Sequence, residues 1–167
     1  MFFKKKVPVD QYCTQVLTTL FSKDREAAWE ALRDLCKDGA LSDVEAQLYY
    51  RHVRAVIVVL MLVAISKNCS MRVSSDAHAF VLIYLRDHKL SEIYEISHAY
   101  SQAFGRSSLA PNRDGVAEMV ADLSVMLTSD KLQEGTVKRF YLEFYGMLRV
   151  FFDDHKSLKL VPMSWED

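Results

Sequence analysis

The sequence predicts an all-α fold: an irregular single-domain bundle of six or seven helices around a buried central helix. Three observations predict this fold. Apolar residues recur at spacings of three and four along nearly all of the 167 residues. Capping and turn residues separate the periodic segments from one another. One long segment becomes apolar on every side, which is typical of a helix that other helices surround.

The periodicity divides the chain into helices and one tail, all within a single domain over residues 1–167. The expected helices cover residues 8–21, 24–37, 42–67, 75–88, 91–104, 114–128 and 136–154, and an extended tail covers 156–167. A chain of this length is typical of one domain. The stretch from Gly105 to Asp114 has the composition of a turn, so we interpret it as a connection inside that domain.

Local signals set the predicted helix boundaries. Pro8 suits the first turn of a helix, where its missing N–H costs nothing. Ser42 and Glu45 have the spacing of a capping box and are expected to open the third helix. Ser91 is the expected cap of the fifth helix, and Gly105 is placed to end that helix.

The central helix is identified by the apolar run Ala55–Ile65. A membrane span needs about 20 apolar residues, and this run is shorter and follows Arg51 and Arg54, so no membrane span is expected. Its β-branched residues would also suit a buried strand, but the helical phase from Ser42 onward favours a helix. A second apolar run, Ala79–Leu85, is expected to lie beside it at the centre of the domain.

Composition excludes some classes of protein. The 21 basic and 22 acidic residues are mixed along the chain and give a net charge of −1, so a dedicated nucleic-acid binder is not expected. The cluster Lys4–Lys6 follows Phe2 and Phe3, and indicates either a solvated terminus or a weak contact with a membrane surface. The three cysteines do not have the pattern of a disulfide framework, which favours reduced thiols and a cytoplasmic protein.

Sequence motifs for catalysis are missing. The chain contains no Gly-x-Ser-x-Gly, no glycine-rich phosphate loop and no His-Glu-x-x-His. No cofactor and no catalytic residue are therefore predicted.

Glu95 and His98 form the pattern Glu-x-x-His, which places a carboxylate and an imidazole on one face of a helix. Di-metal carboxylate bundles need a second such motif and further glutamates, and this chain has one motif. A surface pair is the main interpretation, and a metal-dependent enzyme centred on these two residues is the weakest of three functional hypotheses. His52, beside tyrosines and arginines, is interpreted as a hydrogen-bonded residue at the edge of the core rather than an acid or base.

The last helix and the tail carry an unusual number of aromatic residues. The candidate interaction surface consists of Phe140, Phe144, Tyr145, Phe151, Phe152 and Trp165. Core packing is the ordinary explanation of such residues, and a subunit interface or an apolar ligand pocket is the alternative. Gly146 is costly in the middle of a helix, which suggests a close helix contact there.

The leading hypothesis is a non-enzymatic interaction module that self-associates as a homodimer, with an unknown protein partner as a further possibility. The alternative is a bundle that binds a hydrophobic small molecule in a closed cavity lined by Phe140, Phe144 and Val58. The extended tail either folds onto its own domain or docks on a partner, and the first is favoured.

Overall fold

The computed structural model describes residues 4–107 and 114–163. It confirms the all-α fold, with the seven longer helices, one short helix and a two-stranded parallel sheet in the described part of the chain. The elements are β1 (Lys5–Pro8), α1 (Val9–Leu20), α2 (Lys23–Cys36), α3 (Gly39–Ser42), α4 (Ala46–Asn68), α5 (Met71–Asp87), α6 (Ser91–Arg106), α7 (Gly115–Leu127), α8 (Glu134–Ser157) and β2 (Leu158–Val161).

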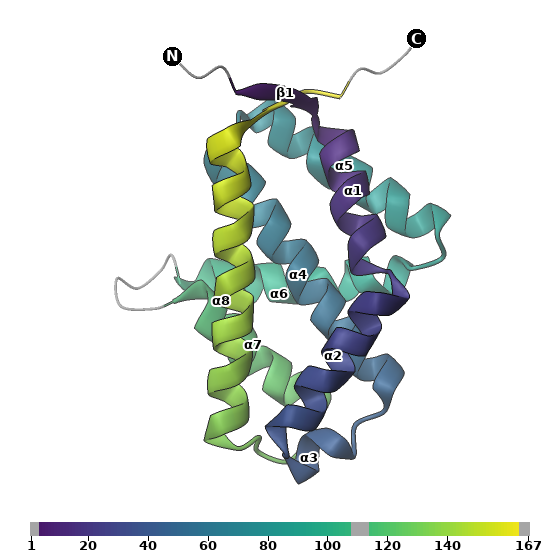
Figure 1. The fold of residues 1–167 in the computed structure, drawn as a ribbon, viewed down its shortest axis with the longest axis vertical. Helices are drawn as coiled ribbons and strands as arrows, with labels where there is room; N and C mark the ends of the chain where they lie inside the picture. The colour runs from purple at the N-terminus through teal and green to yellow at the C-terminus, as the bar shows by residue number, and fades with distance from the viewer. Residues whose placement is uncertain (1–3, 108–113, 164–167) are drawn as a thin grey trace.

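Helix α4 is the centre of the fold, as predicted (Figure 1). Nearly all of its residues from His52 to Ile65 are buried, and it packs mainly against α6 and α8, with further contacts to α5 and α7. By length and mean hydropathy α4 would suffice to cross a membrane, but 83% of its most apolar 18-residue window is buried inside the fold. That burial is the pattern of a core helix enclosed by protein.

Helix α5 differs from the prediction of a second surrounded helix. In the run Ala79–Leu85 only Val81 and Leu85 are buried, and Leu82 is 42% exposed. The helix therefore contacts the core through one face only. It also begins at Met71 instead of residue 75, because Ser70 caps it by accepting a hydrogen bond from the backbone N–H of Val73.

The predicted capping box at Ser42 does not open the central helix. Ser42 ends the short helix α3, and α4 begins at Ala46 after Glu45, whose side chain makes no capping bond. The cause is Arg33, whose guanidinium donates to the backbone carbonyls of Leu41, Ser42 and Val44. Because Arg33 binds these carbonyls, the chain turns in this region and α3 is separated from α4.

Two boundaries of α6 also differ from the prediction. Leu90, not Ser91, precedes the first helical turn, because Lys89 has a left-handed backbone (φ 59°) that turns the chain there. Gly105 lies inside the helix, which continues to Arg106. Arg106 binds Asp122 of α7 at 2.7 Å, and this ion pair holds the last turn of α6 against α7.

The ends of the described chain form a parallel strand pair, where a helical start at Pro8 and an extended tail were expected. Lys5–Pro8 pairs in register with Leu158–Val161. Leu160 is buried, and the backbone N–H of Met163 donates to Asp76 of α5. As far as Met163 the tail therefore folds onto its own domain, which was the favoured alternative. Phe2, Phe3 and Trp165 lie outside the described residues.

Candidate functional site

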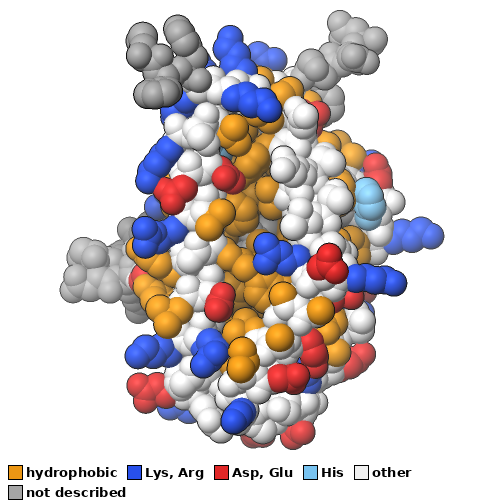
Figure 2. Space-filling model, viewed as in Figure 1, with side chains coloured by type: hydrophobic (Ala, Val, Ile, Leu, Met, Phe, Trp, Pro, Cys, Tyr) orange, Lys and Arg blue, Asp and Glu red, His pale blue; other side chains and the backbone are white. Residues whose placement is uncertain are grey.

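The larger of two hollows described here is a long groove between α8 and the wall formed by α1 and α2, and we call it the α8 groove (Figure 2). Its volume is about 660 Å³. The residues that line it include Tyr12, Arg25, Trp29, Ile57, Leu142, Glu143, Gly146, Val150 and Asp154. Figure 1 shows α4 behind the space between α8 and α1–α2, and Ile57 of α4 contributes to its floor.

The groove exists because α8 buries only part of its circumference. Phe140 and Phe144 face α4 and are completely buried. Successive residues of a helix are rotated by about 100°, so Gly146 and Val150 lie on another flank, about 80–160° around the axis from Phe140 and Phe144. That flank borders the groove, and Val150 is 59% exposed. The same helix therefore carries one packed face and one open apolar flank.

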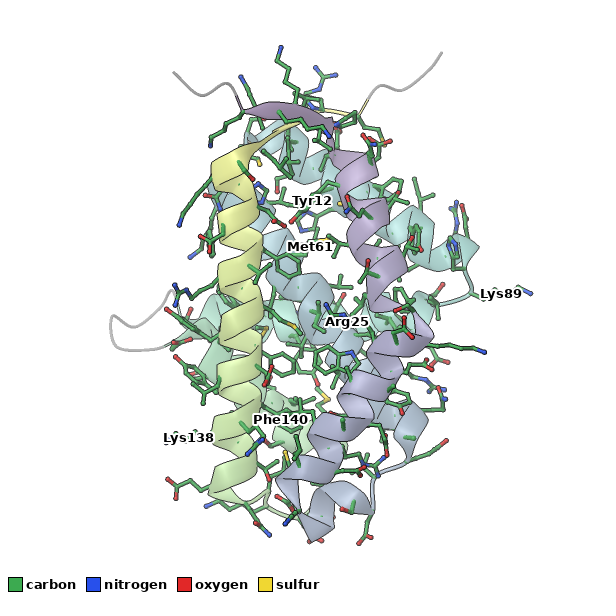
Figure 3. All side chains as sticks on the ribbon, in the orientation of Figure 1. Tyr12, Arg25, Met61, Lys89, Lys138 and Phe140 are labelled. Atoms are coloured by element: carbon green, nitrogen blue, oxygen red, sulfur yellow. The ribbon has the colours of Figure 1, made fainter. Side chains whose placement is uncertain are left out.

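Polar contacts hold α8 to the opposite wall at both ends of the groove. At one end the hydroxyl of Tyr12 donates to Asp154 of α8 at 2.9 Å. Burial, together with this hydrogen bond, raises the pKa of the Tyr12 hydroxyl, so it stays protonated and donates. Figure 3 shows Tyr12 near this end and Phe140 toward the other.

At the other end the carboxylate of Asp38 accepts bonds from the backbone N–H of Gln133 at 2.7 Å and the hydroxyl of Thr136 at 2.8 Å. It also caps α3 through Ala40. Burial opposes the charged form, but these hydrogen bonds outweigh it and hold the pKa of Asp38 below its ordinary value. The distance between the walls is thus set at the ends, and the middle stays open.

Charged groups stand on both walls of the groove. Arg25 lies on the α2 wall and Glu143 on the α8 wall, and neither forms an ion pair with any residue that the structure describes. Figure 3 shows Arg25 over the space between α2 and α8. Trp29 contributes its ring to the wall, and its buried indole N–H has no partner within the described ranges. The groove therefore combines apolar side chains with two charged groups that have no ion-pair partner among the described residues.

The predicted interaction surface is divided by the structure. Phe140 and Phe144 have no exposed surface, and Phe151 is 8% exposed, so these three residues belong to the core. The physical reason is that α4 covers the aromatic stripe of α8 along its length. Tyr145 is 43% exposed and Phe152 is partly buried, and both lie on the flank of α8 away from the groove.

Gly146 has a different role from the predicted close helix crossing. A Cβ atom built at this position meets no heavy atom within 4 Å. No neighbouring element of the described chain therefore requires a glycine there. Instead, the missing side chain widens the groove between Leu142 and Val150.

The structure places Glu95 and His98 on the exposed side of α6. His98 has its Nε2 3.2 Å from the amide nitrogen of Gln102. Within residues 4–107 and 114–163, no group of three or more His, Cys, Asp or Glu side chains could hold a metal ion. Asp122 and Glu118, the acidic residues of α7, bind Arg106. The described residues therefore offer no set of ligands around Glu95 and His98.

His52 is buried, and its Nδ1 lies 2.7 Å from the hydroxyl of Tyr100 on α6. Burial lowers the pKa of the imidazole and raises that of the phenol. Both groups are therefore neutral near pH 7, and the phenol donates to the imidazole. This pair joins α4 to α6 as a satisfied polar contact in the core.

The small-molecule hypothesis predicted a closed apolar cavity lined by Phe140, Phe144 and Val58. All three side chains are packed in the core, and neither of the two hollows described here includes them. The smaller hollow, of about 300 Å³, lies between α4, α5 and α6.

Gly146 and Phe151 were singled out from the sequence, but the other residues that line the groove were not. Leu142, Gly146 and Val150 are spaced by four residues and lie along one line of the helix, and this spacing could have been noticed. The opposite wall could not have been found in this way, because Arg25 and Trp29 approach α8 only in the folded chain.

Comparison of the chain with protein-family models, curated protein sequences and solved structures finds no match. The functional argument therefore depends on the residues and geometry described above.

Proposed function

We propose that the protein is a binding module that self-associates through the α8 groove, in which the α8 flank of a second copy packs. The observation that supports this proposal is the exposed line of Leu142, Gly146 and Val150 beside an apolar groove on the same chain. A twofold dimer needs both halves of a self-complementary surface on one protomer, and this line and its adjoining groove supply them.

The shape of the groove favours a helix as its occupant. From Leu142 to Asp154 the α8 wall is about 18 Å long, at a rise of about 1.5 Å per residue. Amphipathic helices bind in grooves of this kind through residues spaced by three and four. Small-molecule sites enclose most of the ligand surface, whereas this groove is open along its length (Figure 2).

Gly146 and the two available charges favour a second copy. A glycine without neighbours lets another helix backbone approach closely at that point. Arg25 and Glu143 stand on opposite walls, so a twofold arrangement can bring Arg25 of one protomer to Glu143 of the other. Such complementary charges fix the register of an interface more than they add affinity.

The experiment compares two valines on exposed helix surfaces. Val150 (59% exposed) borders the groove, and Val125 of α7 (79% exposed) lies outside it. Sedimentation equilibrium is expected to show a dimer for the unchanged protein. Val150→Arg should raise its dissociation constant by about tenfold or more, because a charge is then placed in the apolar interface. Val125→Arg should leave the constant unchanged.

A chain that stays monomeric at every soluble concentration would refute this proposal, as would equal weakening by the two substitutions. Circular dichroism and thermal unfolding of both variants show whether the fold is kept. Native mass spectrometry of the purified protein tests the small-molecule alternative, which predicts an additional bound mass.

A further inference from the structure

The smaller hollow lies on the opposite side of α4 from the α8 groove. Its floor is formed by Val59 and Leu62, and the rotation of about 100° per residue places both roughly opposite Ile57, which lines the groove. Walls are provided by α6, with Tyr94 and Phe104. We call this hollow the α4–α6 pocket. Its volume of about 300 Å³ is at the lower end of the range for small-molecule sites.

The interior of this pocket is apolar. Val59 and Leu62 are buried, and the rings of Tyr94 and Phe104 are partly buried. An apolar floor with aromatic walls suits a ligand that carries a compact hydrophobic body.

The rim of the pocket carries one lysine and two histidines, which come from three helices. Lys67 comes from α4, His78 from α5 and His98 from α6, and all three are exposed. Among the lining residues that the structure describes there is no aspartate or glutamate. This composition contrasts with the mixed charges of the chain as a whole.

Lys67 is the cation available to a ligand. Its ammonium group lies 5.7 Å from the centre of the Phe104 ring, and it forms no ion pair within the described part of the protein. Other cations near the pocket are engaged: Arg106 binds Asp122 and Glu118, and Arg51 binds Glu92. An ammonium group beside an aromatic wall is well placed to bind an anion attached to an apolar body.

The imidazole of His78 lies at the rim and is held by its own helix. Its Nδ1 lies 2.8 Å from the backbone carbonyl of Ser74. A carbonyl only accepts hydrogen bonds, so Nδ1 donates to Ser74, and this bond fixes the orientation of the ring on α5. Ser101 adds a hydroxyl to the lining of the same opening, whereas the hydroxyl of Ser66 is hydrogen-bonded to that of Ser74.

From these observations we infer that the α4–α6 pocket binds a small amphipathic anion, in which one carboxylate or sulfonate is attached to a compact apolar body. The apolar body occupies the space above Val59 and Leu62, and the anionic group lies at the rim beside Lys67. This site is separate from the α8 groove and does not depend on self-association.

The probe is 8-anilino-1-naphthalenesulfonate, with N-phenyl-1-naphthylamine as its uncharged counterpart. Both dyes become fluorescent in apolar surroundings, and they differ by the sulfonate. Lys67→Met should weaken binding of the sulfonate dye by about tenfold, which is the usual effect of losing one charge-assisted hydrogen bond. Binding of the uncharged dye should change little. Lys138→Met, which removes an exposed lysine of α8 outside the pocket, is the matched control (Figure 3).

The dye could also enter the α8 groove, and Val150→Arg distinguishes the two sites. Loss of sulfonate binding in Val150→Arg but not in Lys67→Met would overturn the inference. Equal loss of both dyes in Lys67→Met would overturn it as well. NMR of the histidine rings in the unchanged protein gives an independent readout: the sulfonate dye should shift the imidazole signals of His78 and His98, and unchanged signals would contradict the site.

Discussion

Two flanks of α8 point in different directions from the helix axis and have opposite surroundings. The flank with Phe140 and Phe144 is covered by α4 and has no exposed surface. The flank with Leu142 and Val150 is also apolar, yet both residues are more than half exposed and border a groove. An apolar side chain on a helix therefore indicates a preference for burial, but it does not show which neighbouring element will cover it. No described element covers the open flank, which is why that flank is the proposed interface.

The largest expected effect tests the packed flank. Phe144→Ala should lower the free energy of unfolding by about 3–5 kcal/mol, because it leaves a cavity between α8 and α4. Leu142→Ala, on the open flank, should change it by less than about 1 kcal/mol. Chemical denaturation at a concentration where the protein is monomeric gives both values. Similar losses for the two variants would mean that the flanks do not differ as described.

An intermediate effect tests what holds the groove at one end. Asp38 has a pKa below its ordinary value, so its contribution to stability is present above the pKa of the unfolded chain, about 3.9. That contribution is lost as pH falls through the lower pKa of the folded state. Asp38→Asn should cost about 1.5–3 kcal/mol near neutral pH, because it weakens bonds to Gln133 and Thr136.

Unfolding curves measured between pH 7 and pH 3 follow this contribution. The difference between Asp38→Asn and the unchanged protein should shrink at the acid end of that range. A constant difference across the range would show that the charge of Asp38 does not anchor α8.

The smallest expected effect has the opposite sign. Gly146→Ala should raise the free energy of unfolding of the monomer by about 0.5–1 kcal/mol, because alanine is the better helix former and the new Cβ meets no neighbour. Gly115→Ala is a useful contrast, because a Cβ there would lie 2.7 Å from the ring of Phe104. Thermal unfolding of dilute protein measures both changes, and destabilisation by Gly146→Ala would indicate a close contact at that position.

Much of the fold was predictable because periodicity and burial are local properties of a helix. The all-apolar stretch of α4 indicated its central position, and the seven longer helices are all present. The error at the start of α4 occurs where a distant side chain decides the local structure. Arg33 separates α3 from α4 by binding carbonyls eight to eleven residues away, and no capping pattern at Ser42 could have revealed this.

The candidate sites were less predictable, since each depends on several helices. Phe140 and Phe144 were grouped with Tyr145 by their residue type, although they differ by their direction around the helix axis. The rim of the α4–α6 pocket combines Lys67, His78 and His98, which are separated in the sequence and lie on different helices. Single-sequence patterns describe one helix at a time and do not show such combinations.

The pairing of β1 with β2 has a consequence for how the chain folds. Residues 5–8 can acquire their partner only after residues 158–161 have been synthesised, so this contact closes a loop that includes nearly all of the described chain. Closing a long loop carries an entropic cost that helix contacts nearer in sequence do not have. The helices are therefore expected to assemble first, and the strand pair to form late, as the step that completes the native structure.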